Sequence, residues 1–178
     1  MAQHIKPQIH ADKRRFISLS IFICVHLCLS AVFIFLCYNI PMTNEELIKT
    51  AIKMTEMSYV PYSHFHVGAA LLTTDGKVYT GCNIENAAYG PSNCAERTAI
   101  FKAVSEGDKD FSAIAIVGGP EDENGKAKLE AYCSPCGVCR QVMAEFCNKD
   151  FKIILAKSPS DYKIFTLGEL LPESFSIN

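Results

Sequence analysis

Two short cysteine motifs, far apart along the chain, constrain its fold more than any other feature. The first is Cys94-Ala95-Glu96 and the second is Pro135-Cys136-Gly137-Val138-Cys139. Each motif precedes a run with helical character, at 95–104 and 138–147. The positive end of a helix macrodipole lowers the pKa of a thiol at the helix N-terminus and prepares that thiol to bind a metal. We therefore expect a fold that brings two helix N-termini together around one metal ion.

The residues of these motifs favour a catalytic zinc site. Cys94, Cys136 and Cys139 offer three thiolates, and three protein ligands leave the fourth tetrahedral position for water. Glu96 follows closely enough to carry protons to and from that water. Arg97 shares a helix face with Cys94, so its guanidinium is placed to hydrogen-bond the ligand sulfur and to offset the charge of the thiolates. Together these residues predict zinc-assisted hydrolysis.

Each residue taken alone has a simpler interpretation. Cys136 and Cys139 would fit a redox pair or half of a structural zinc site. Glu96 would fit a carboxylate stabilised by the helix dipole, and Arg97 an ordinary solvated charge. The Cys-Ala-Glu element argues against these readings, because a structural zinc needs no adjacent proton carrier.

Periodicity and turn signals predict helices interleaved with strands. Asn93 is a suitable N-cap for the helix after Cys94, and Pro135 suits the first turn of the helix near Cys136. The other expected elements are a helix at 43–57, strands at 65–73, 77–83, 112–117 and 151–156, an acidic loop at 121–130, and a short helix after Thr166. Gly118-Gly119-Pro120 is expected to end the third strand, and capping-box spacings at Thr43-Glu46 and Thr166-Glu169 are expected to open the first and last helices. This order predicts an α/β fold, a three-layer α/β/α sandwich on a mixed sheet.

Several segments carry a resemblance to a known family. They are Tyr62-Ser63-His64-Phe65 to Leu72, Gly81 to Ala87, Cys94 to Ile100, Ser134 to Val142 and Glu169 to Pro172. In these segments the chain closely resembles the small homotetrameric cytidine deaminases, from Met42 to Phe175, in a three-cysteine variant of the zinc deaminase pattern. The resemblance implies a five-stranded sheet and one Zn2+ per subunit. It also implies hydrolytic deamination of cytidine and 2′-deoxycytidine to uridine and 2′-deoxyuridine, with release of ammonia, in pyrimidine salvage.

The same resemblance implies which residues contact the substrate. Asn83 and Glu85 are expected to bind the ribose hydroxyls, and Phe65 is expected to pack near the base. Backbone groups of Ala95 and Ser134 are expected to contact the pyrimidine edge.

The resemblance also implies a homotetramer with shared active sites. Tyr89 and Phe175 are expected to reach the active site of a neighbouring subunit. The alternative for both residues is packing without ligand contact.

Other functions remain to be weighed against nucleoside deamination. A deaminase of nucleic-acid polymers should offer a basic groove and stacking aromatics, whereas this chain has a net charge of −2 and contains no Trp. A deaminase of aminopyrimidine antibiotics is harder to exclude, although Asn83 and Glu85 argue for a sugar. A non-catalytic zinc protein, the third class, would not need Glu96.

An apolar segment precedes this predicted domain. Residues 16–38 are rich in Ile, Leu, Phe, Val and Cys, and as a helix they would be about 34 Å long, enough to span a bilayer core. Lys13-Arg14-Arg15 would place the N-terminus in the cytosol and the remainder beyond the membrane. A secretory signal fits less well, because the run is too long and no small-residue cleavage site follows it. Two readings stay open: a membrane anchor, or an upstream extension of a soluble enzyme whose translation often begins at Met42.

The chain is thus expected to have two parts. Residues 1–41 form an N-terminal extension with a candidate transmembrane helix at 16–38, and residues 42–178 form the cytidine deaminase-like domain. Thiolate ligands favour a reducing compartment, so we expect the catalytic domain in the cytosol, with membrane anchoring as the alternative.

Overall fold

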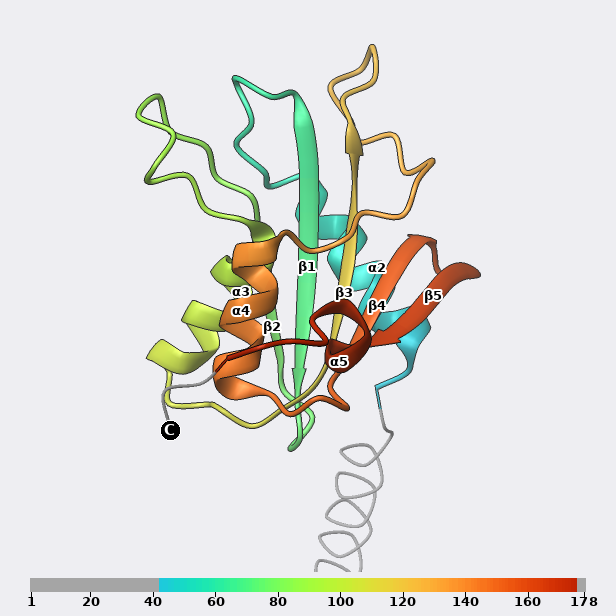
Figure 1. The fold of residues 1–178 in the computed structure, drawn as a ribbon. Coiled ribbons are helices and arrows are strands. Elements are labelled where there is room, and N and C mark those ends of the chain that lie inside the picture. The colour runs from blue at the N-terminus through green and yellow to red at the C-terminus, as the bar shows by residue number, and fades with distance from the viewer. Residues whose placement is uncertain (1–41, 176–178) are drawn as a thin grey trace, which may run out of the picture. The chain divides into compact units, whose positions relative to one another are not determined.

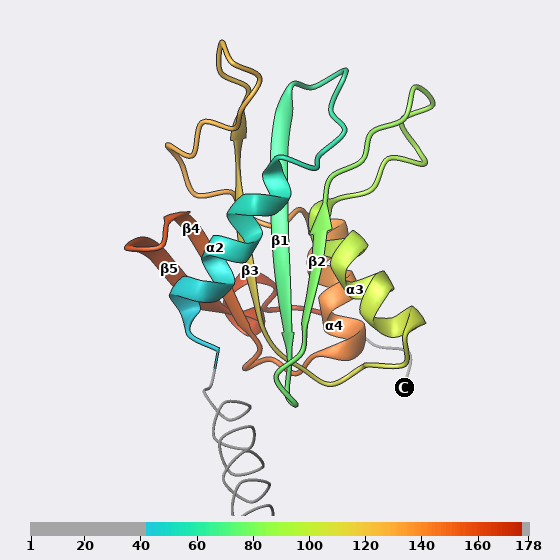
Figure 2. The ribbon, with the colours of Figure 1, turned by 180° about the vertical axis from the view of Figure 1, so that it is seen from behind.

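A computed structural model describes residues 42–175, which build one sheet with helices on both of its faces (Figures 1 and 2). The strands are β1 (Phe65–Thr73), β2 (Val78–Cys82), β3 (Phe111–Pro120), β4 (Lys152–Ser158) and β5 (Asp161–Thr166), and the helices are α2 (Asn44–Thr55), α3 (Ala95–Ser105), α4 (Gly137–Phe146) and α5 (Leu167–Leu170). The strand order is β2-β1-β3-β4-β5. Neighbouring strands pair antiparallel except β3 and β4, which are parallel. The expected mixed five-stranded sheet is confirmed.

The central strand β3 shows how the layers are separated. Ala115 and Val117 pack in the apolar cluster formed with α2, whereas Ile114 and Ile116 pack in the cluster formed with α3 and α4. Alternate residues of a strand point to opposite faces, and both faces are covered here, so β3 is continuously apolar from Ala113 to Val117 instead of alternating. This arrangement places α3 and α4 in the same layer, where their N-termini can meet.

Both predicted capping boxes are present. The Thr43 hydroxyl accepts a hydrogen bond from the Glu46 amide at 3.2 Å, and the Glu46 carboxylate accepts one from the Thr43 amide at 3.0 Å. Thr166 and Glu169 form the same reciprocal pair at the start of α5. These pairs satisfy backbone donors that have no partner within the helix.

The predicted N-cap of the first cysteine helix is wrong, although its predicted first residue, Ala95, is confirmed. The second cysteine helix begins at Gly137, one residue before the predicted run at 138–147. Cys94 is the N-cap of α3, and Cys136 is the N-cap of α4. Asn93 instead donates its side-chain amide to the Thr98 hydroxyl, and Pro135 lies before the cap, outside the first turn. Both cap cysteines have extended backbones and no capping hydrogen bond from their side chains. Their sulfur atoms therefore remain available for another partner.

Two features of the sheet differ from the sequence-based expectation. Gly118 and Gly119 were expected to end the third strand, yet they pair with Val67 and His66 inside β3. A Cβ atom on Gly119 would lie only 1.7 Å from the Lys128 carbonyl oxygen, so these glycines permit a close backbone approach. The sequence pattern did not predict β5, because this strand lies at the edge of the sheet and has no consistently buried face.

The expected apolar N-terminal helix at 16–38 lies outside the described residues. Within 42–175, no helix combines the length and the apolar character needed to cross a bilayer.

Candidate active site

The three predicted zinc ligands converge. The sulfur atoms of Cys94, Cys136 and Cys139 all lie within 4.8 Å of one another, and no other such group of potential metal ligands occurs among residues 42–175. Cys94 Sγ is 3.8 Å from Cys136 Sγ, and Cys136 Sγ is 3.5 Å from Cys139 Sγ. Tetrahedral zinc with Zn–S bonds of about 2.3 Å requires sulfur atoms about 3.8 Å apart. The donor set therefore fits zinc in both chemistry and spacing.

The close packing of α3 on the sheet explains how Cys94 reaches this cluster. Gly81 of β2 lies beneath the first turn of α3, where a Cβ atom would come within 2.2 Å of the Ala95 carbonyl oxygen. Because glycine has no Cβ, the backbone of α3 packs directly against the backbone of β2. Ala95 is fully buried between the ligand Cys94 and the carboxylate Glu96.

Cys94 is the thiol of the cluster that ionises most readily. Hydrogen bonds from Cys139 and Arg97 lower the pKa of the Cys94 thiol to about 5. The pKa of Cys139 is raised, because this thiol donates to Cys94 and is buried. Arg97 Nη2 lies 3.6 Å from Cys94 Sγ and 3.3 Å from the Ser92 carbonyl oxygen, as its predicted position on the helix required. The cluster thus holds a first thiolate readily, and a cation favours ionisation of the other two thiols.

Glu96 is the buried carboxyl group of the site. Its relative exposure is 4%, and this burial raises the pKa of Glu96 to about 7, an effect reinforced by the neighbouring Cys94 thiolate. A carboxyl group with a pKa near neutrality can both accept and release a proton under physiological conditions. Its position in the first turn of α3 brings it to the same cavity as Cys94 and Cys136.

A cavity of about 320 Å³ lies over the cluster. Its lining includes eight of the residues singled out from the sequence, namely Asn83, Glu85, Cys94, Ala95, Glu96, Arg97, Ser134 and Cys136. Sequence reasoning missed four further lining residues, which are Val67, Ser92, Asn93 and Cys133. Only their proximity to matched motifs could have pointed to them.

Asn83 and Glu85 line the cavity while binding the backbone at the start of β1. Asn83 Oδ1 accepts from the Val67 amide at 2.8 Å, and its Nδ2 donates to the Phe65 carbonyl at 2.8 Å. Glu85 Oε2 accepts from the Tyr62 and Ser63 amides at 3.0 and 3.1 Å. Hydrogen bonds from Ser63 and Tyr62 hold the pKa of Glu85 below its ordinary value, so this side chain is an anion in a fixed position.

Three predicted contact residues do not line this cavity. Phe65 is partly exposed beside Asn83, at the first position of β1. Tyr89 is 73% exposed, has a left-handed φ of 56°, and lies 6.2 Å from the Tyr62 ring, centroid to centroid. Phe175 is 68% exposed and accepts a hydrogen bond from Gln141 through its carbonyl oxygen. Within one chain, these side chains are not part of the pocket.

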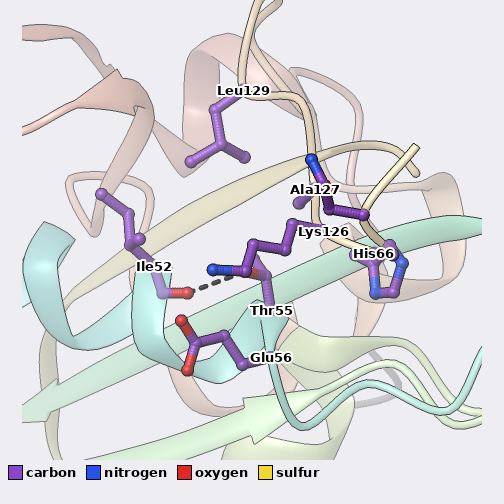
Figure 3. Close-up of a pocket in the computed structure, with 9 residues that line it drawn as sticks. Ile52, Thr55, Glu56, His66, Lys126, Ala127 and Leu129 are labelled. Carbon is purple, nitrogen blue, oxygen red and sulfur yellow. Dashed lines mark hydrogen bonds between the residues drawn. The ribbon is translucent and has the colours of Figure 1, made fainter. Parts of the chain in front are cut away.

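A second cavity, of about 460 Å³, lies between the end of α2 and the loop at 121–130 (Figure 3). Its lining mixes apolar residues such as Ile52 and Leu129 with Glu56, His66 and Lys126. None of the residues singled out from the sequence lines it. The chemistry expected from the sequence therefore belongs to the smaller cavity.

Comparisons with known proteins agree with this geometry. The family model of the cytidine and deoxycytidylate deaminase zinc-binding region matches residues 41–155. A cytidine deaminase from Sporosarcina psychrophila is 51% identical over 135 residues, which are 76% of this chain and 93% of that protein. Blasticidin-S deaminase from Bacillus cereus is 32% identical over 141 residues, which are 79% of this chain and 98% of that protein.

Solved structures give the same result. The crystal structure of cytidine deaminase from Burkholderia pseudomallei superposes with a TM-score of 0.67 and 45% identity, covering 75% of this chain and 100% of that one. The chain therefore belongs to the cytidine and deoxycytidylate deaminase family of zinc-binding proteins.

Proposed function

We propose that this protein deaminates free cytidine and 2′-deoxycytidine to the corresponding uridines, with release of ammonia. The observation that carries the proposal is the placement of the buried carboxyl group of Glu96 beside three convergent thiols in one cavity. A purely structural metal site gains nothing from a buried acid at its edge. Relatives named cytidine deaminase, 51% and 52% identical to this chain, support cytidine as a substrate.

The proposed roles follow from the positions of the groups. Cys94, Cys136 and Cys139 would hold zinc, which supplies an activated water when bound. Glu96 takes a proton from the attacking water and gives it to ring N3 while the water oxygen adds to C4. Glu96 then takes the remaining proton from the hydroxyl group on C4 and passes it to the 4-amino group, which leaves as ammonia when the C4–N bond breaks and the C4–O double bond forms. Arg97 holds the Cys94 sulfur and offsets the charge of the thiolates.

Substrate contacts complete the proposal. Asn83 and Glu85 would bind the sugar hydroxyls, because they bring an amide and a carboxylate to the cavity wall. Backbone groups of Ala95 and Ser134 would contact the pyrimidine edge. The Ser134 hydroxyl is itself held by Arg140 at 2.9 Å, which supports a fixed local backbone.

A homotetramer with shared active sites is part of the proposal. Phe65, Tyr89 and Phe175 are exposed in the single chain, and a neighbouring subunit would bring Tyr89 and Phe175 to the base and sugar. Phe175 also lies over an apolar hollow of about 610 Å³ that includes Phe101 and Val138. Large exposed apolar side chains in one area are typical of contact surfaces. We also propose a reducing compartment, the cytosol, for the thiolate site, whereas the role of residues 16–38 stays a prediction.

The test is ammonia release by the purified protein and by its Glu96→Gln variant. Gln preserves the shape of the side chain but carries no titratable proton, so turnover of cytidine should fall by at least about 100-fold while zinc content is unchanged. Wild-type turnover by Glu96→Gln would refute the proton-transfer role. Substrates should include cytidine, 2′-deoxycytidine and blasticidin S. Preferential turnover of blasticidin S would favour the antibiotic-deaminase alternative, and a zinc-loaded protein without turnover would refute enzymatic function.

A further inference from the structure

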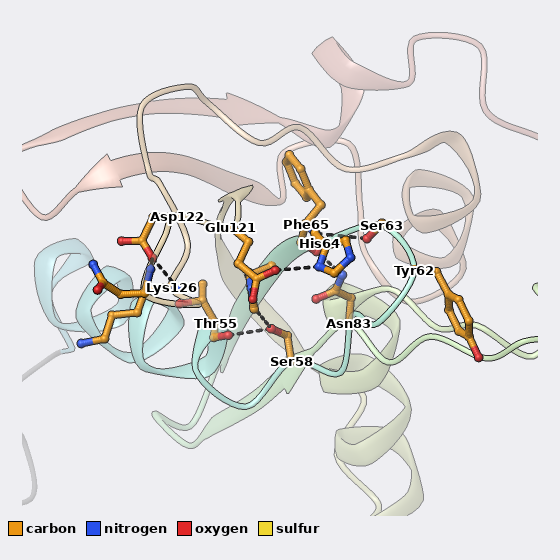
Figure 4. A network of polar contacts seen from close by, with 12 residues as sticks. Thr55, Ser58, Tyr62, Ser63, His64, Phe65, Asn83, Glu121, Asp122 and Lys126 are labelled. Carbon is orange, nitrogen blue, oxygen red and sulfur yellow. Dashed lines mark hydrogen bonds and ion pairs between the residues drawn. The ribbon is translucent and has the colours of Figure 1, made fainter.

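The segment at 62–67 lies between two sets of contacts. On one side, Asn83 and Glu85 bind its backbone through the four hydrogen bonds described above. On the other side, the segment is held by Glu121, the residue that follows β3 (Figure 4). The proposed sugar-binding residues are therefore attached to a segment whose far side depends on a residue outside the cavity.

Glu121 holds this segment through both backbone and side chain. Its amide donates to the His64 carbonyl at 2.7 Å, and its Oε2 lies 2.6 Å from His64 Nδ1. A carboxylate only accepts, so His64 Nδ1 carries the proton of this hydrogen bond. Glu121 Oε1 lies 3.8 Å from His66 Nε2.

The backbone at this point needs such support. His64 has a left-handed φ of 51°, a conformation that residues with a Cβ rarely adopt. Glu121 is itself well placed to supply it, because the adjoining loop is closed by two hydrogen bonds from the Asn124 and Lys126 amides to Asp122 Oδ1. His64, in this rarely adopted conformation, is thus hydrogen-bonded to the residue that follows the central strand β3.

We propose that Glu121 and His64 are positioning residues for the nucleoside, and that they act by fixing the segment that orients Glu85 and Asn83. This inference rests on the proposed sugar-binding role of those two residues. The side chains of His64 and Glu121 are 65% and 32% exposed, so the contact between them contributes little to folding stability. Its loss should therefore affect substrate binding more than folding.

The expected signature is a change in KM without a matching change in kcat. Glu121→Ala should raise the KM for cytidine about tenfold, because the sugar-binding groups are no longer fixed before binding, while kcat stays within about twofold. Glu121→Gln retains an acceptor for His64 Nδ1 and should recover most of the lost affinity. Glu123→Ala is the matched control, because Glu123 is an exposed residue of the same loop and should leave both constants unchanged. Thermal denaturation of each variant shows whether it is folded.

A double-mutant cycle with Glu85→Gln tests whether Glu121 acts through Glu85. If it does, Glu121→Ala raises KM much less in the Glu85→Gln background than in the wild type. An equal rise in both backgrounds would overturn the inference, as would a folded Glu121→Ala variant with wild-type KM or with a loss confined to kcat. A wild-type KM in Glu85→Gln alone would instead refute the proposed sugar contact, so the two failures are distinguishable.

Discussion

Substitution of Gly81 by alanine should displace α3, the helix that carries Cys94 at its N-cap and Glu96 in its first turn. The added Cβ would lie 2.2 Å from the Ala95 carbonyl oxygen and 2.5 Å from the Ala99 amide nitrogen. An ordinary carbon–oxygen contact is about 3.3 Å, so α3 must retreat by about 1 Å. Both contacts are backbone atoms of the helix, which cannot escape by a rotamer change. Cys94 and Glu96, on either side of Ala95, would therefore move with the helix.

Two magnitudes follow from this displacement. Overpacking of a close contact costs about 1–3 kcal/mol of unfolding free energy. A misplacement of about 1 Å at a reacting centre lowers turnover by about 100-fold. Urea denaturation and the kcat/KM for cytidine measure the two effects in the same Gly81→Ala preparation.

The control for this experiment is Gly90→Ala. A Cβ at Gly90 meets nothing closer than 3.9 Å, so stability should hardly change. If Gly81→Ala retained wild-type stability and wild-type kcat/KM, the close packing of α3 on β2 could not be what positions Cys94 and Glu96.

Three further changes test other parts of the structure. Arg97→Ala removes a hydrogen bond to Cys94, so in metal-free protein the pKa of the Cys94 thiol should rise from about 5 toward its ordinary value. The rate of Cys94 alkylation, measured against pH, should then have its midpoint at a higher pH. An unchanged midpoint would contradict the contact between Arg97 and Cys94. Thr43→Ala breaks the capping box of α2 and should cost about 1 kcal/mol in urea denaturation with kcat/KM unchanged; no loss of stability would argue against the cap. Met143→Ala leaves a cavity at a fully buried position on α4 and should lower the free energy of unfolding in urea by about 2–5 kcal/mol. A smaller loss would mean that neighbouring side chains repack to fill the cavity.

The sequence was most informative where local chemistry decides the structure. The capping boxes at Thr43 and Thr166 depend on residues three positions apart, and both formed as expected. The convergence of the three cysteines was also predictable, because a metal site restricts where its ligands can lie.

Other features depend on tertiary contacts that local patterns do not encode. Asn93 seemed a suitable N-cap, but it forms two backbone hydrogen bonds with Ile84 in an isolated β-bridge, and Cys94 is the N-cap instead. Strand β5 forms because it pairs with β4, although its own residues show no clear apolar face. The link from Glu121 to His64 joins residues 57 positions apart, which no motif spacing could indicate.

The central claim is that zinc held by Cys94, Cys136 and Cys139 is required for turnover. Elemental analysis of active protein, repeated during stepwise removal and return of zinc, tests it most directly. Cytidine deamination should fall and recover in proportion to bound zinc, reaching its maximum at about one ion per chain. Undiminished deamination by folded protein that contains no stoichiometric metal would contradict the account.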